Sequence, residues 1–211
     1  MGSSSEGVIK LNLGCASRPL EGYVNIDMDS LEDMKVRYPS VVFPEGVEIF
    51  PYDIFNLPYK DNTVSEIKAD SILEHLSFLE EPKLFYEVKR VLKSGGIFEF
   101  SVPDFEDTVK LWIKAKDEWK DFFRNDQEAI KTQHWFGQNS YSFDNRWGYL
   151  TASIFGSQNG PGQFHTNCYT IPKIRAILKR LNFEEVEIST YRWKGDRELM
   201  IKVVAKKKQE K

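Results

Sequence analysis

A glycine and a carboxylate, each at the end of a short apolar run, are the residues of this sequence best placed to bind a ligand. The apolar run 8–13 breaks at Gly14, and the run 24–26 ends at Asp27. A glycine lets the backbone approach a ligand where a Cβ would obstruct it. An acid at the tip of the second strand can accept hydrogen bonds from both hydroxyls of a ribose. The pattern is typical of a nucleotide-binding strand–loop–strand unit.

Three histidines are candidates for proton transfer, because histidine is the usual general base near neutral pH. His75 follows a predicted strand at 64–69, where open α/β sheets place ligand contacts. The alternative is that Glu74 and His75 only cap or orient the following helix. His134 and His165 lie in an irregular aromatic segment at 131–169, where they are either solvated loop residues or part of a substrate site.

The two cysteines, Cys15 and Cys168, are too few for a disulfide framework. The sequence spacing of His134, His165 and Cys168 matches no closed set of zinc ligands, so we expect no metal. Cys15 has no base near it in the sequence, which favours small size over a nucleophilic role. This cysteine usage fits a reducing compartment, and we expect a cytoplasmic protein.

Strand and helix patterns alternate along the chain, as they do where parallel strands are joined by right-handed crossovers. Short apolar runs predict strands at 8–13, 24–26, 47–50, 64–69, 97–102, 183–189 and 199–205. Helical spacing of apolar residues predicts helices at 81–92, 109–123 and 174–181. The loop between Gly14 and Asp27 is so short that we expect only a turn there.

The length of 211 residues suits a single domain, 1–211, with one core. We expect a flexible leader at 1–7, an insertion or lid at 104–169 and a solvated tail at 206–211. The chain holds 29 basic and 32 acidic residues, so it lacks the positive field that attracts a nucleic-acid backbone. No apolar run approaches membrane-spanning length.

Five separated segments, in the same order, resemble the class I S-adenosylmethionine-dependent methyltransferases. The likeness is strongest to the small type that opens with a Leu-Asn-Leu-Gly-Cys-Gly signature. The segments are 11–16, 22–27, 52–64, 69–76 and 85–103. They cover about the first half of the chain, and the last two strands agree by topology.

The resemblance implies a three-layer, Rossmann-like α/β fold: a seven-stranded, mostly parallel sheet with one antiparallel strand. It implies S-adenosyl-L-methionine as cofactor, with Asp27 on the ribose and Asp53 and Ile54 at the adenine. The catalytic candidates remain His75, His134 and His165. The residues expected to bind the cofactor are Asn12, Leu13, Gly14, Cys15, Ala16, Asp27, Met28, Asp53, Ile54, Asp70, Ser71 and Glu74.

Two of these assignments have alternatives. Asp53 is followed by residues that commonly form a turn, so its carboxylate could serve the backbone alone. Met28 either covers an adenine face or only fills a gap. We expect a small-molecule or glycan acceptor, because the chain is near neutral and the aromatic segment can serve as a platform for such a molecule.

Ala16 departs from the signature, which usually has glycine there, and alanine resists a positive φ. This departure favours a rival, a cofactor-binding or partner protein of the same fold without turnover. A second rival is a protein or RNA methyltransferase, supported by the cluster Arg192, Lys194 and Arg197. A nicotinamide enzyme is disfavoured, because the chain has no G-x-G-x-x-G run to hold a pyrophosphate.

Overall fold

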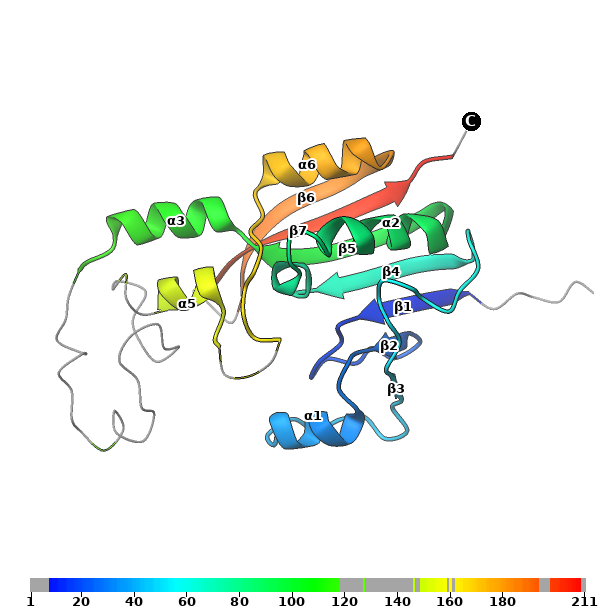
Figure 1. Cartoon of the computed structure of the whole chain (residues 1–211), viewed down its shortest axis with the longest axis horizontal. Helices are drawn as coiled ribbons and strands as arrows, with labels where there is room; N and C mark the ends of the chain where they lie inside the picture. The colour runs from blue at the N-terminus through cyan, green and yellow to red at the C-terminus, as the bar shows by residue number, and fades with distance from the viewer. Residues whose placement is uncertain are drawn as a thin grey trace, which may run out of the picture.

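A computed structural model describes residues 8–117, 127, 146, 149–158, 160, 162–193 and 198–209. Seven strands form one sheet in the order β3-β2-β1-β4-β5-β7-β6, drawn in Figure 1. Their bounds are β1 Ile9–Leu13, β2 Val24–Ile26, β3 Ile49–Phe50, β4 Val64–Asp70, β5 Leu92–Pro103, β6 Phe183–Trp193 and β7 Glu198–Lys207. The helices are α1 Leu31–Arg37, α2 Glu81–Val91, α3 Phe105–Lys114, α5 Tyr149–Phe155 and α6 Ile171–Arg180, with a 3₁₀ turn, η1, at Leu73–His75.

Strands β1 to β5 pair in parallel, with Leu11 opposite Val24 between β1 and β2. Strand β7 runs antiparallel to both β5 and β6. The predicted mixed, seven-stranded α/β sheet is therefore confirmed. Parallel pairing brings the carboxyl ends of β1, β2 and β4 to one edge of the sheet, where open α/β sheets bind their ligands.

One face of the sheet packs on α2 and α6, which lie over the same side in Figure 1. Pro82 occupies the first turn of α2, where its missing N–H costs nothing. The rings of Phe85, Phe98 and Phe100 meet edge to face or tilted, with centroids 4.9–6.0 Å apart. This apolar layer holds β4 and β5 in place and so fixes the edge at which the cavity described below lies.

The opposite face of β4 and β5 carries half-buried charged residues. Lys10 pairs with Glu66 at 3.0 Å, and Glu99 pairs with Lys202 at 3.3 Å. A mostly parallel sheet usually carries helices on both faces. No helix follows β1 on this face, because the chain from Gly14 to Tyr23 forms only turns and irregular structure, as the short loop predicted.

Several predicted boundaries were wrong. Strand β3 is shorter than 47–50, whereas β5 begins five residues early and β6 runs on to Trp193. The helix predicted at 109–123 is α3, which starts at Phe105 because Asp104 accepts a hydrogen bond from the Asp107 N–H at 3.1 Å. It ends at Lys114.

Strand β7 continues through Lys206 and Lys207, so the predicted tail begins within the sheet. The Lys207 side chain is buried, and its ammonium donates to Asn62 Oδ1 and to the carbonyls of Lys89 and Leu92 at 2.6–2.8 Å. A charge count along the sequence cannot reveal three such acceptors, because they lie more than 100 residues away, in a turn, in α2 and at the start of β5. No helix in the described part of the chain is long and apolar enough to cross a membrane.

Candidate cofactor site and the adjacent histidine cluster

Gly14 ends β1 at a positive φ of +62°. A Cβ added there would lie 2.5 Å from Ile72 Cδ1 and 3.0 Å from Ile72 Cβ. The glycine is therefore required by its own backbone conformation and by a neighbouring side chain. The sequence predicts that the close approach of a ligand requires glycine here; the positive φ and Ile72 are two further reasons that hold without a ligand.

Asp27 follows β2, and backbone donors hold both of its carboxylate oxygens. Oδ2 accepts from the Ala16 N–H at 2.9 Å, and Oδ1 accepts from the Asp29 N–H at 3.2 Å. These bonds join the glycine loop to the end of β2. Each oxygen keeps a lone pair, so the carboxylate is oriented and can still accept from a diol.

A cavity of about 420 Å³ opens at this edge of the sheet, and its size is typical of small-molecule sites. Seven of the predicted cofactor residues line it: Gly14, Ala16, Asp27, Met28, Asp53, Ile54 and Ser71. The catalytic candidate His75 lines it too, as do Gly162 and Gln163 from the predicted insertion. The tertiary fold thus brings these five separated sequence segments to one cavity.

The structure is compatible with both alternatives that the sequence left open for Asp53. Its Oδ1 accepts from the Phe55 N–H at 2.8 Å, which is the expected turn, and the residue also lines the cavity. Met28 is 80 % exposed at the rim and fills no gap in the core.

Five predicted cofactor residues do not line this cavity. Leu13 is fully buried in the core. Asn12 is buried, and its amide donates to Asn25 Oδ1 at 2.9 Å, which ties β1 to β2. Burial raises the pKa of the Cys15 thiol to about 12, which agrees with a packing role rather than a nucleophilic one.

The other two are Asp70 and Glu74. Asp70 pairs with Arg18, accepts from the Ser101 hydroxyl, and lines a second cavity of about 420 Å³. That second cavity also has Lys68, Glu99 and Lys202 in its wall, all on the polar face of the sheet. Glu74 is 3 % exposed and belongs to the histidine cluster described next.

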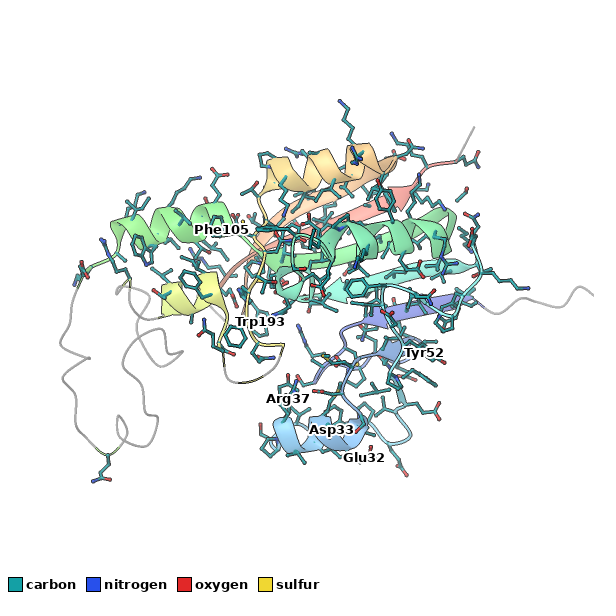
Figure 2. The ribbon with its side chains drawn as sticks, viewed as in Figure 1. Glu32, Asp33, Arg37, Tyr52, Phe105 and Trp193 are labelled. Carbon is teal, nitrogen blue, oxygen red and sulfur yellow. The ribbon has the colours of Figure 1, made fainter. Side chains whose placement is uncertain are left out.

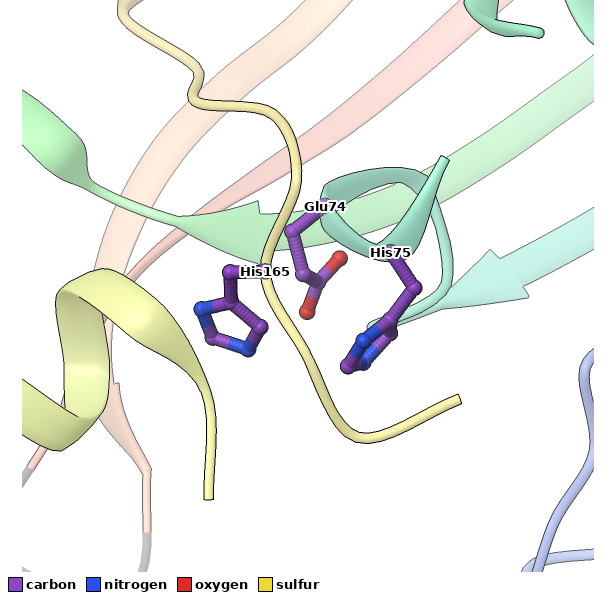
Figure 3. A group of neighbouring side chains, drawn as sticks. All are labelled: Glu74, His75 and His165. Carbon is purple, nitrogen blue, oxygen red and sulfur yellow. The ribbon is translucent and has the colours of Figure 1, made fainter. Parts of the chain in front are cut away.

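Glu74, His75 and His165 form a compact group beside the cavity, shown in Figure 3. One carboxylate oxygen and one nitrogen from each ring lie within 4.8 Å of one another. The two imidazole centroids are 4.9 Å apart at an angle of 71°. His134, the third catalytic candidate, lies outside the described residues.

Burial controls the protonation of this group. It raises the pKa of Glu74 to about 8 and lowers that of His75. Burial and the neighbouring His75 lower the pKa of His165 to about 4. His165 is therefore neutral at physiological pH and only a weak base.

Residues 13–100 match the family model described as a methyltransferase domain. Solved structures agree in fold. A methyltransferase from Methanosarcina mazei aligns over 98 % of this chain and 95 % of its own, at 16 % identity and a TM-score of 0.59. One from Archaeoglobus fulgidus aligns over 96 % and 87 %, at 12 % identity and a TM-score of 0.57. No curated protein matches at a significant level.

Residues 13–100 carry a methyltransferase domain, and the whole sheet has the fold of the class I S-adenosylmethionine-dependent methyltransferases. That domain implies S-adenosyl-L-methionine as its cofactor. Another structural neighbour is the 1,6-didemethyltoxoflavin-N1-methyltransferase of Burkholderia thailandensis, solved with 1,6-didemethyltoxoflavin and S-adenosylhomocysteine. The alignment with this neighbour covers 95 % of this chain and 71 % of the neighbour's chain, at 11 % identity and a TM-score of 0.53.

The cavity beside Asp27 has a wall that sequence reasoning missed. Arg37 and Tyr38, at the end of α1, line it together with Tyr52, and Figure 2 shows Arg37 on α1 and Tyr52 next to β3. Arg37 pairs with Asp29 at 2.6 Å. A signal for α1 was present in the sequence, because Ser30 and Asp33 form a capping box.

Ala16 of the methyltransferase loop has a φ of +42°, the conformation that glycine adopts without strain. We predict that Ala16→Gly raises the free energy of unfolding by up to about 1 kcal/mol. Relief of the left-handed backbone, worth about 1–2 kcal/mol, exceeds the added entropy of the unfolded chain, about 0.4–1 kcal/mol. Chemical denaturation measures this change, and calorimetry with S-adenosylhomocysteine should show equal or tighter binding. A lower free energy of unfolding together with weaker S-adenosylhomocysteine binding would mean that the alanine methyl supports the loop.

Proposed function

We propose that the cavity beside Asp27 holds S-adenosyl-L-methionine and presents its methyl group to an acceptor that enters past His75 and Gln163. The observation that carries this proposal is the Asp27 carboxylate, fixed by two backbone donors at the end of β2. In this pose Asp27 accepts from the ribose hydroxyls. Ile54 and Asp53 face the adenine, and the methionine arm passes Gly14.

The charge of the cavity supports this donor. Four carboxylates line it, from Asp27, Asp29, Asp53 and Glu80, against one guanidinium, Arg37, that is already paired with Asp29. Such a wall attracts a sulfonium and disfavours the phosphates of a nucleotide cofactor. The sulfonium is already reactive, so alignment of donor and acceptor supplies most of the acceleration.

We further propose a small-molecule or glycan acceptor. The near-neutral chain, with 29 basic and 32 acidic residues, supports it, as do Gly162 and Gln163, which the insertion 104–169 contributes to the wall. In this proposal the insertion acts as a lid over the acceptor. The two cysteines, both free thiols, support a reducing, cytoplasmic location.

The test has two parts. Calorimetry with S-adenosylhomocysteine should show a single site. Incubation of metabolite and glycan pools with the methyl donor should yield a product about 14 Da heavier by mass spectrometry, the mass of the added CH₂. Product from RNA or protein only would refute the acceptor class. Tight binding with no product in any pool would favour the non-catalytic rival.

A further inference from the structure

The histidine cluster joins two parts of the chain that are remote in sequence. Glu74 and His75 belong to η1, and His165 precedes α6. The Glu74 carbonyl accepts from the N–H groups of Thr166 and Asn167 at 2.9 and 3.1 Å, and the Thr166 hydroxyl donates to the His75 carbonyl at 3.0 Å. These bonds hold the three side chains in a defined relation.

Hydrogen bonds to backbone carbonyls fix the tautomer of both rings. His75 Nδ1 lies 3.0 Å from the Phe164 carbonyl, and His165 Nδ1 lies 2.9 Å from the Ser153 carbonyl. A carbonyl oxygen can only accept, so each Nδ1 carries the proton of a neutral ring. Each Nε2 is then unprotonated, and its lone pair is available to bind a cation. Metal-binding histidines usually have this arrangement, with the other ring nitrogen donating to a carbonyl.

The third member is a buried carboxylate with an unsatisfied oxygen. Glu74 is 3 % exposed, and its Oε2 has no hydrogen-bond partner among the described residues. A buried polar atom without a partner costs about 1–3 kcal/mol, and a buried charge costs more unless it is compensated. Figure 3 shows the carboxylate between the two rings, where a cation would compensate it.

We propose that Glu74, His75 and His165 bind one first-row divalent cation through a carboxylate oxygen and two Nε2 atoms. Two imidazoles and a carboxylate suit zinc, cobalt or iron better than magnesium or calcium, which prefer oxygen ligands. Two atoms bound to one cation at about 2.1 Å lie at most about 4.2 Å apart. The ligand atoms of the three side chains now lie within 4.8 Å of one another, so small side-chain rotations bring them to that separation.

Three protein ligands leave coordination positions for an exogenous oxygen. Because His75 also lines the cavity beside Asp27, the cation lies close to the acceptor end of that cavity and can polarise an acceptor oxygen. This consequence rests on the proposed function; the metal site itself does not. The proposal replaces the sequence-based expectation of no metal.

The test is calorimetry on the full chain, stripped with a chelator and titrated with Zn²⁺, Co²⁺ and Mg²⁺. We expect one equivalent of Zn²⁺ or Co²⁺ to bind and Mg²⁺ to bind far more weakly. Glu74→Gln keeps the shape of the side chain and should weaken Zn²⁺ binding about a hundredfold or more. His165→Gln should do the same, which covers the case in which one variant fails to fold. Circular dichroism confirms folding of each variant.

Cys168→Ser provides the control, because Cys168 is the other free thiol next to His165 and could capture zinc by itself. Its affinity for Zn²⁺ should equal that of the unmodified chain. No Zn²⁺ or Co²⁺ binding, or binding lost in Cys168→Ser but kept in Glu74→Gln, would overturn the proposal. S-adenosylhomocysteine binding is measured separately, so failure of the metal site and failure of the donor site give different results.

Discussion

Asp27→Ala should weaken S-adenosylhomocysteine binding by about a hundredfold to a few thousandfold. A hydrogen bond to a charged group contributes about 1.5–3 kcal/mol, and in the proposed pose Asp27 accepts from two ribose hydroxyls. A loss of about 3–5 kcal/mol corresponds to that range, because each 1.4 kcal/mol is about tenfold. Isothermal calorimetry gives the dissociation constants directly.

The same substitution also removes the acceptors of the Ala16 and Asp29 N–H groups. Each of these hydrogen bonds has a carboxylate as acceptor and contributes about 1.5 kcal/mol, the low end for a charged partner because both bonds are only part-buried, so the free energy of unfolding should fall by about 3 kcal/mol without loss of the fold. Asp61→Ala is the matched control. It removes one carboxylate, paired with Arg90 at 2.8 Å and outside the cavity, and should leave the affinity unchanged. Unchanged binding in Asp27→Ala would place the nucleoside elsewhere.

Gly14→Ala should lower the free energy of unfolding by about 1–4.5 kcal/mol. A non-glycine residue in the left-handed region costs about 1–2 kcal/mol, less the roughly 0.4–1 kcal/mol by which alanine reduces the entropy of the unfolded chain. The new Cβ would lie 2.5 Å from Ile72 Cδ1, and overpacking of this kind adds about 1–3 kcal/mol. Chemical denaturation with a two-state fit measures the total. Because Ile72 also lines the cavity, its displacement should weaken cofactor binding as well.

Gly22→Ala separates the two contributions. Gly22 has a positive φ of +76°, yet an added Cβ meets nothing within 4 Å. It should therefore cost only the backbone part, about 1–2 kcal/mol, less the same roughly 0.4–1 kcal/mol of unfolded-chain entropy. Ile72→Val removes the Cδ1 atom and should rescue part of the loss in Gly14→Ala. Equal losses in the two glycine variants, with no rescue, would show that Ile72 moves aside freely.

The sequence predicted the mixed sheet and the family because both depend on local patterns. Apolar runs that end at Gly14 and Asp27 mark strands whose carboxyl ends meet at one edge once the strands pair in parallel. Seven predicted cofactor residues accordingly line one cavity. Asn12, Cys15 and Asp70 line the second cavity instead. Asn12 and Asp70 lie on strands, where alternate side chains point to opposite faces and the neighbouring strand decides what each one meets.

Sequence reasoning also missed features whose partners are distant in the chain. The burial of Lys207 depends on acceptors at Asn62, Lys89 and Leu92. The α1 wall of the cavity was missed for a different reason. The capping box at Ser30 and Asp33 can be recognised in the sequence, but the short helix after it shows no clear apolar periodicity. Helix boundaries such as the start of α3 depend on a single cap, Asp104.

By itself, the sequence determined that this chain forms a mixed α/β sheet with a glycine turn after β1 and an acid after β2, because strand periodicity, the glycine and the acid act over a few residues. Only the tertiary structure decided that Glu74, His75 and His165 share one buried group. That grouping depends on a loop folding back across η1 from about 90 residues away. Burial, which sets the protonation of those side chains, is a property of the packed molecule and not of any stretch of sequence.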